Sequence, residues 1–86
     1  MSDNKTKIQT LDELIAQLKD VHHSCVALVE KLAAVQLKAM ETGLDRLSDS
    51  MGKPFSSISG SAKLLEEILQ TAETQKAKST KDAEGG

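Results

Sequence analysis

The chain has 86 residues, a formal net charge of −2 and an aromatic content of 1%. This balance argues against nucleic-acid binding, because such affinity rests on Lys and Arg contacts with phosphate and on aromatic stacking. With Cys25 as the single cysteine, no internal disulfide forms, and we expect a small buried hydrophobe in a reducing compartment. No apolar run approaches the roughly 20 residues of a membrane span, so we expect a cytoplasmic protein.

Both ends of the sequence lack an apolar period. Residues 1–8 and 77–86 are polar, small or charged, and we predict that they are disordered tails. The domain that remains covers residues 9–76. Its packing has to come from Leu, Val, Ile, Ala and Met contacts, which are typical of helical bundles.

The first predicted element is a long amphipathic helix over residues 10–51. Thr10-Leu11-Asp12-Glu13 forms a capping box at its start, in which the Thr10 and Glu13 side chains satisfy each other's backbone amides. The apolar arc that follows covers nearly half of the helix circumference. An ordinary surface helix has a narrower stripe, so we expect this helix to contact more than one neighbour.

Within this helix the apolar residues follow the three-four spacing of a coiled coil. After Ala39 the pattern slips by one position, and we expect the helix to continue through the slip. Gln36 lies at the centre of the apolar face, where a buried polar residue commonly fixes register or oligomer state. The spacing predicts a self-association seam that consists of Leu11, Leu14, Leu18, Val21, Cys25, Leu28 and Leu32.

Gly52-Lys53-Pro54 predicts the end of the first helix, because glycine suits the position past a helix C-terminus and proline cannot continue the helix. We expect a turn at 52–55 and a second, shorter helix at 56–76. The predicted fold is therefore an all-α helical hairpin. Since the second helix would cover only half of the first, the exposed seam predicts assembly into a coiled-coil or helix-bundle oligomer.

No arrangement of residues in the sequence predicts catalysis, a metal site or a cofactor. His22 and His23 are adjacent, so on a helix their side chains project about 100° apart and cannot readily share one ion. Acidic residues are plentiful but alternate with Lys on the predicted solvent faces. No nucleophile, base and orienting group have a spacing that would bring them together, so we expect a protein that is not an enzyme.

The middle of the chain resembles the helical core of phasins, the small proteins that coat polyhydroxyalkanoate storage granules. The resemblance covers about residues 26–50 and consists of Val29-Glu30-Lys31-Leu32, Val35-Gln36-Leu37 and Gly43-Leu44-Asp45-Arg46-Leu47. It implies a non-enzymatic coat protein at the surface of storage granules. The Ser- and Gly-containing stretch at 55–61 departs from the alanine-rich helix that phasins have at this point.

Two functions remain open from the sequence. The first is a coat on a hydrophobic granule, and the second is a small interaction module or regulator that binds a helix of another protein. Both would use the same apolar face, and both allow a homo-oligomer. The residues that we expect to bind the surface or the partner are Leu18, Val21, Leu28, Val29, Leu32, Leu37 and Met40.

Overall fold

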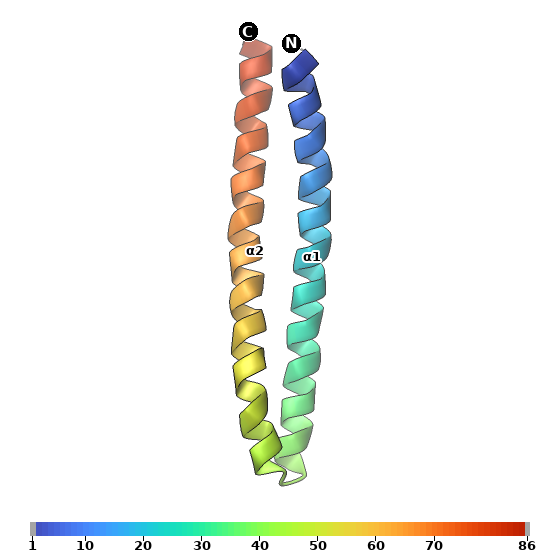
Figure 1. The fold of residues 1–86 in the computed structure, drawn as a ribbon, viewed down its shortest axis with the longest axis vertical. Helices are drawn as coiled ribbons and strands as arrows, with labels where there is room; N and C mark the ends of the chain where they lie inside the picture. Colours follow the sequence, from blue (N-terminus) through green and yellow to red (C-terminus); the bar gives the residue numbers. More distant parts are fainter. Residues whose placement is uncertain (1, 86) are drawn as a thin grey trace.

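The protein folds as a long hairpin of two antiparallel helices. The computed structural model describes residues 2–85 and the side chains of residues 6–81. Helix α1 (Ser2–Glu41) and helix α2 (Asp45–Gly85) lie side by side along their whole length (Figure 1). The radius of gyration is 19.2 Å, whereas a compact chain of this length would have about 12 Å. The predicted all-α helical hairpin is confirmed, in the form of an extended rod.

The connection between the helices is a tight turn at residues 42–44. Gly43 has a φ of 75°, in the left-handed region that glycine adopts without steric cost. The amide of Leu44 donates to the Ala39 carbonyl at 2.9 Å, and the amide of Gly43 donates to the Met40 carbonyl at 3.1 Å. These two bonds form a Schellman motif, which closes the C-terminus of α1.

The predicted helix boundaries at 10–51 and 56–76 and the predicted turn at 52–55 are wrong, because Gly52 and Pro54 lie inside α2. A proline inside a helix costs about 3 kcal/mol. The turn at 42–44 compensates for this cost, since it gives two helices of 40 and 41 residues that cover each other completely. A turn at 52–55 would have left half of α1 without a partner.

The predicted disordered tails are also corrected over most of their length. Residues 2–8 continue α1 and residues 77–85 continue α2, while Met1 and Gly86 lie outside the described residues. Ile8 is half-buried and Ser79 is buried, so the contact between the helices extends into both segments. The two ends are helical because the helices are nearly equal in length, so that the N-terminal and C-terminal segments pack against each other.

The two helices meet along a seam with three-four spacing in both. We label the seven-residue repeat a to g, with a and d in the seam. The seam residues of α1 are Ile8, Leu11, Ile15, Leu18, His22, Cys25, Val29, Leu32, Gln36 and Ala39. Those of α2 are Ser48, Met51, Phe55, Ile58, Ala62, Leu65, Leu69, Ala72, Lys76 and Ser79.

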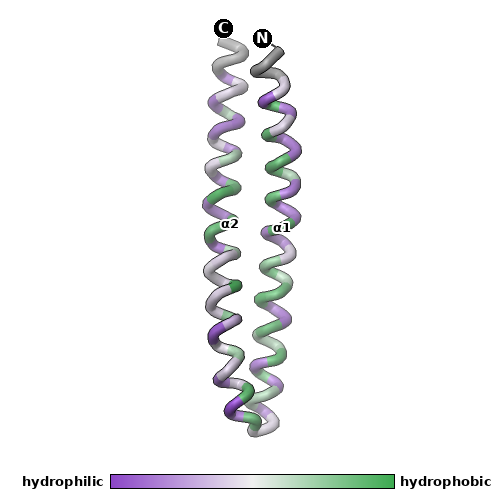
Figure 2. The backbone as a smooth tube through the Cα atoms, viewed as in Figure 1, coloured by the Kyte–Doolittle hydropathy of each residue, from purple (hydrophilic) through white to green (hydrophobic). Residues whose placement is uncertain are grey.

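The interior of this hairpin is thin. Among the described side chains only Ile15, Ala39, Ser48 and Ser79 are buried, and none is fully enclosed. Figure 2 shows that hydrophobic residues are denser along α1, above all in the half nearest the turn, than along α2. Because α2 contributes many small or polar residues to the seam, much of the apolar surface of α1 stays in contact with solvent.

Candidate binding faces of the hairpin

One broad side of the hairpin carries a stripe of exposed apolar side chains from both helices. In an antiparallel pair, the g positions of the two helices lie on one side of the seam and the e positions on the other. We call the first side the uncharged face and define it by Leu14, Val21, Leu28, Val35, Leu47, Leu64 and Ile68. Their exposed fractions range from 45% to 58%. Large apolar side chains grouped in this way mark a binding surface more often than chance exposure.

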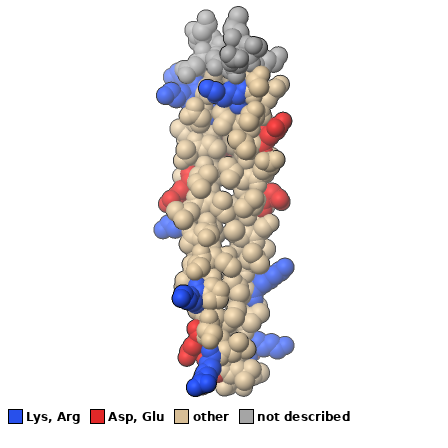
Figure 3. Space-filling view, in the orientation of Figure 1, with Lys and Arg blue, Asp and Glu red and all other residues tan. Residues whose placement is uncertain are grey.

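Acidic residues are absent from this side over the described side chains. Every Asp and Glu between residues 6 and 81 occupies a b, e or f position, and none occupies a c or g position. In Figure 3, α1 descends on the right, and because both helices are right-handed this view looks onto the g positions. Uncharged atoms fill the centre of this side, and charged side chains stand along its margins and near its ends.

An open groove of about 360 Å³ continues the uncharged face toward the turn. Val35 and Leu47 line it from g positions of the two helices, which confirms that these positions share one side. Ala39 and Leu44, the residues joined by the Schellman hydrogen bond, also line it, together with Lys38 and Thr42. A groove of this size can accept an apolar side chain from a partner.

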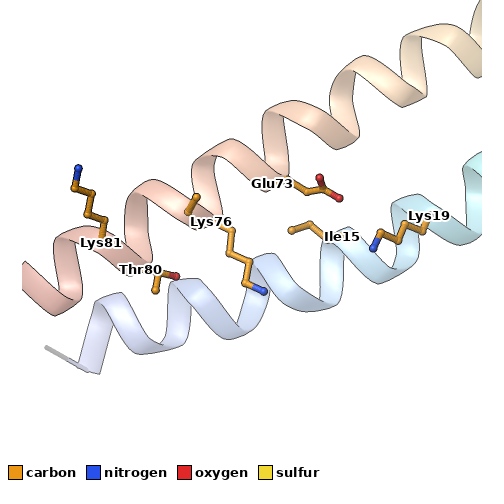
Figure 4. A pocket seen from close by; sticks show the side chains of 7 residues that line it. Ile15, Lys19, Glu73, Lys76, Thr80 and Lys81 are labelled. Atoms are coloured by element: carbon orange, nitrogen blue, oxygen red, sulfur yellow. The ribbon is translucent and has the colours of Figure 1, made fainter.

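The opposite side of the hairpin is charged in the half away from the turn. Figure 4 shows an open groove in which Lys19 reaches in from α1, Glu73 from α2, and Ile15 lies between the helices. Lys76 extends from α2 across the groove and forms an ion pair with Asp12 of α1. Both partners remain about half exposed, with side-chain exposures of 42% and 51%. We call this side, with Asp12, Lys19, Glu66, Glu73 and Lys76, the charged face.

The structure divides the residues that were predicted to bind a surface or partner. Leu18, Val29 and Leu32 lie half-buried in the seam against α2. Val21 and Leu28 belong to the uncharged face. Leu37 and Met40 are exposed, at 56% and 58%, on other sides of α1.

The predicted self-association seam is divided in the same way. Leu11, Leu18, Cys25 and Leu32 pack within the hairpin, whereas Leu14, Val21 and Leu28 remain exposed on the uncharged face. The four packed residues occupy d positions. Helix α2 packs against these and against the neighbouring a positions, and it leaves the g positions on the other side of the d residues exposed. The sequence reasoning missed Leu47, Leu64 and Ile68 as binding residues, because it did not place the second helix in its true register against the first.

Gln36 lies in the seam next to the turn. Its Nε2 donates a 3.2 Å hydrogen bond to the backbone carbonyl of Ser48 in α2. Its role in fixing the register stays a prediction. His22 is half-buried in the seam, while His23 is exposed.

Two further properties of the described residues bear on function. No group of three or more His, Cys, Asp or Glu side chains in the described part of the chain is placed to hold a metal ion. Neither helix has, over the same residues, a stretch long and apolar enough to cross a membrane. No protein-family model, curated protein or solved structure matches this chain, so function is inferred from the two faces and from the local resemblance.

Proposed function

We propose that this protein is a non-enzymatic, phasin-like amphipathic helical protein that coats hydrophobic polyhydroxyalkanoate granules. The observation that supports the proposal is the separation of the two sides of the hairpin. The uncharged face presents seven exposed apolar side chains, while the acidic residues lie at positions that point away from it. A rod of this kind lies flat on an apolar surface with its charges in water, as interfacial amphipathic helices do on lipid.

The segment that resembles phasins contributes to the uncharged face. Residues 26–50 contribute Leu28, Val35 and Leu47, together with the apolar groove beside the turn. The charged face would then point to solvent. Its mixture of Lys, Asp and Glu would keep coated particles apart, and the protein would be located at the granule surface.

Co-sedimentation with purified polyhydroxyalkanoate particles tests the proposal. The wild-type protein should pellet with the particles, and the double variant Val21→Asp with Leu28→Asp should stay in the supernatant, because a carboxylate on an apolar surface carries a large desolvation cost. Leu37→Asp is the matched control. It places one carboxylate on a somewhat more exposed position of α1, nine residues and about 180° away from Leu28, and it should pellet like the wild type. Wild-type protein that remains in the supernatant would refute the coat function.

A second candidate function is a small helical interaction module. The groove beside the turn supports it, since Val35, Ala39, Leu44 and Leu47 form an apolar notch of the size that accepts an anchor residue from a partner helix. Val35→Asp would then abolish capture of that partner from a lysate, whereas Leu37→Asp would retain it. Self-association, expected from the sequence, is compatible with either candidate.

A further inference from the structure

The hairpin exposes more surface than a folded chain of its mass normally does. Its accessible surface is 6542 Å², whereas about 4,900 Å² is typical for a monomer of this mass. The excess of about 1,600 Å² is larger than the roughly 800 Å² per partner of a standard interface and falls in the range of permanent homodimers. The free protein therefore exposes enough surface to form an interface with another molecule.

The apolar stripe is nearly symmetric about its own midpoint. Along α1, Leu14, Val21, Leu28 and Val35 recur every seven residues, so an antiparallel copy of α1 would place Val21 opposite Leu28 and Leu14 opposite Val35. A twofold axis through the midpoint of the stripe produces these pairs. A twofold interface requires a surface that is complementary to itself in this sense.

The same axis passes the second helix at a small residue. The Asp12–Lys76 ion pair and the Gln36–Ser48 hydrogen bond show which levels of the two helices lie side by side, and they place the midpoint of the α1 stripe level with Ser61 and Ala62. The g positions of α2 around this level are Pro54, Ser61 and Ile68. The same axis would therefore place Ile68 opposite Pro54, and a small serine would lie where α2 approaches its own copy.

We propose that the uncharged face of the free protein is covered by the uncharged face of a second copy, giving a four-helix bundle. The two hairpins are antiparallel, with their turns at opposite ends. This arrangement goes beyond the proposed coating role, although both use the same face. Binding to a granule and dimerisation are therefore mutually exclusive for any one hairpin.

The orientation rests on the twofold symmetry of the α1 stripe, in which Val21 meets Leu28 and Leu14 meets Val35. Between residues 6 and 81 no Asp or Glu occupies a c or g position, so a contact through the uncharged face brings no carboxylates together across the interface.

Light scattering on the full chain, in a buffer without polymer, measures the first consequence. At tens of micromolar the wild-type protein should have twice the mass of the 9.2 kDa chain. Leu28→Glu should halve that mass, and the control Leu37→Glu should leave it unchanged. Circular dichroism on each sample reports whether the helices persist. A wild-type monomer with full helical signal, or a dimer that survives Leu28→Glu, would overturn the proposal.

Disulfide trapping tests the orientation without weakening the apolar contacts by charge. In a Cys25→Ala background, Val21→Cys with Leu28→Cys should give a covalent dimer on oxidation. The two positions lie seven residues apart, about 10 Å along one helix, which is too far for a bridge within the chain. The control pair Leu14→Cys with Val21→Cys has the same spacing but no facing partner, so it should stay monomeric on a denaturing gel. Equal cross-linking of both pairs, or of neither, would contradict the antiparallel bundle.

The two proposals fail separately. A dimer that does not pellet with polymer particles would refute the coating role and leave the bundle in place. A monomer that pellets would do the reverse. If both hold, adding particles should lower the yield of the Val21→Cys and Leu28→Cys cross-link, because the polymer occupies the face that the partner would cover.

Discussion

The side-chain amide of Gln36 donates a 3.2 Å hydrogen bond to the backbone carbonyl of Ser48, which ties α1 to α2 four residues after the turn ends. At the far end of the rod, Lys76 of α2 is paired with Asp12 of α1. These two polar contacts lie at opposite ends of a seam that is formed mainly by apolar and small side chains, with His22 between them. They show which residues of the two helices lie at the same level of the rod.

Gln36→Leu should raise the melting temperature, because leucine adds apolar surface to the seam and outweighs the loss of one hydrogen bond worth about 1 kcal/mol. The same change should broaden the distribution of oligomers, since an apolar side chain fits several registers. Thermal unfolding and light scattering on one sample measure the two effects. Lower stability with an unchanged oligomer would mean that the hydrogen bond to Ser48 stabilises the fold by more than the added leucine does, and that Gln36 does not fix the register.

Gly43→Ala and Gly52→Ala should change stability in opposite directions. Gly43 has a φ of 75°, where an L-residue is strained, so alanine there should cost about 1–2 kcal/mol. Gly52 lies inside α2 with open space around its Cα, so alanine there should add about 0.5–1 kcal/mol. Denaturant unfolding of the two variants compares them directly. If Gly43→Ala stabilised the protein and Gly52→Ala destabilised it, the turn would lie at Gly52-Lys53-Pro54 instead.

Ile15→Ala should be among the most damaging truncations in the chain. Ile15 is 8% exposed, and removal of a buried aliphatic side chain costs about 2–5 kcal/mol, a large share of what a core this thin supplies. Leu37→Ala, at a position 56% exposed, should cost about 1 kcal/mol or less. Loss of helical circular dichroism at 37 °C is the measurement. Equal effects of the two substitutions would show that the seam is not where the stability lies.

Lys76→Met should leave stability unchanged or raise it, although it removes the ion pair with Asp12. Both partners are about half exposed, and pairs of this kind contribute about 0–1 kcal/mol. Methionine keeps the length of the side chain and adds apolar surface at an a position. The melting temperature of the wild type should also depend little on salt. A drop of several degrees in the variant, with strong salt sensitivity in the wild type, would contradict this.

The sequence alone determined the helical character of the chain and its return as a hairpin. Three-four spacing, few aromatics and a lack of strand patterns left helices as the only way to bury the apolar residues. The line of d positions through Leu11, Leu18, Cys25 and Leu32 was also readable, because it lies in the centre of the apolar arc. The slip after Ala39 marked the true turn, whereas the sequence reasoning interpreted it as a slip within one continuous helix.

Only the tertiary structure decided where the chain turns and which side of the d line is covered. Gly52-Lys53-Pro54 is the stronger local stop signal, but its cost inside a helix is limited to a few kcal/mol. Packing along two helices of equal length accumulates over every turn of both, so the turn formed at Gly43. Two sets of apolar residues beside the d positions could have completed the seam. One set contains Ile15 and Val29, and the other contains Leu14 and Leu28. The contact with α2 selected the first set, and the second became the exposed stripe because a helix in a two-helix hairpin can bury only one side of its apolar arc.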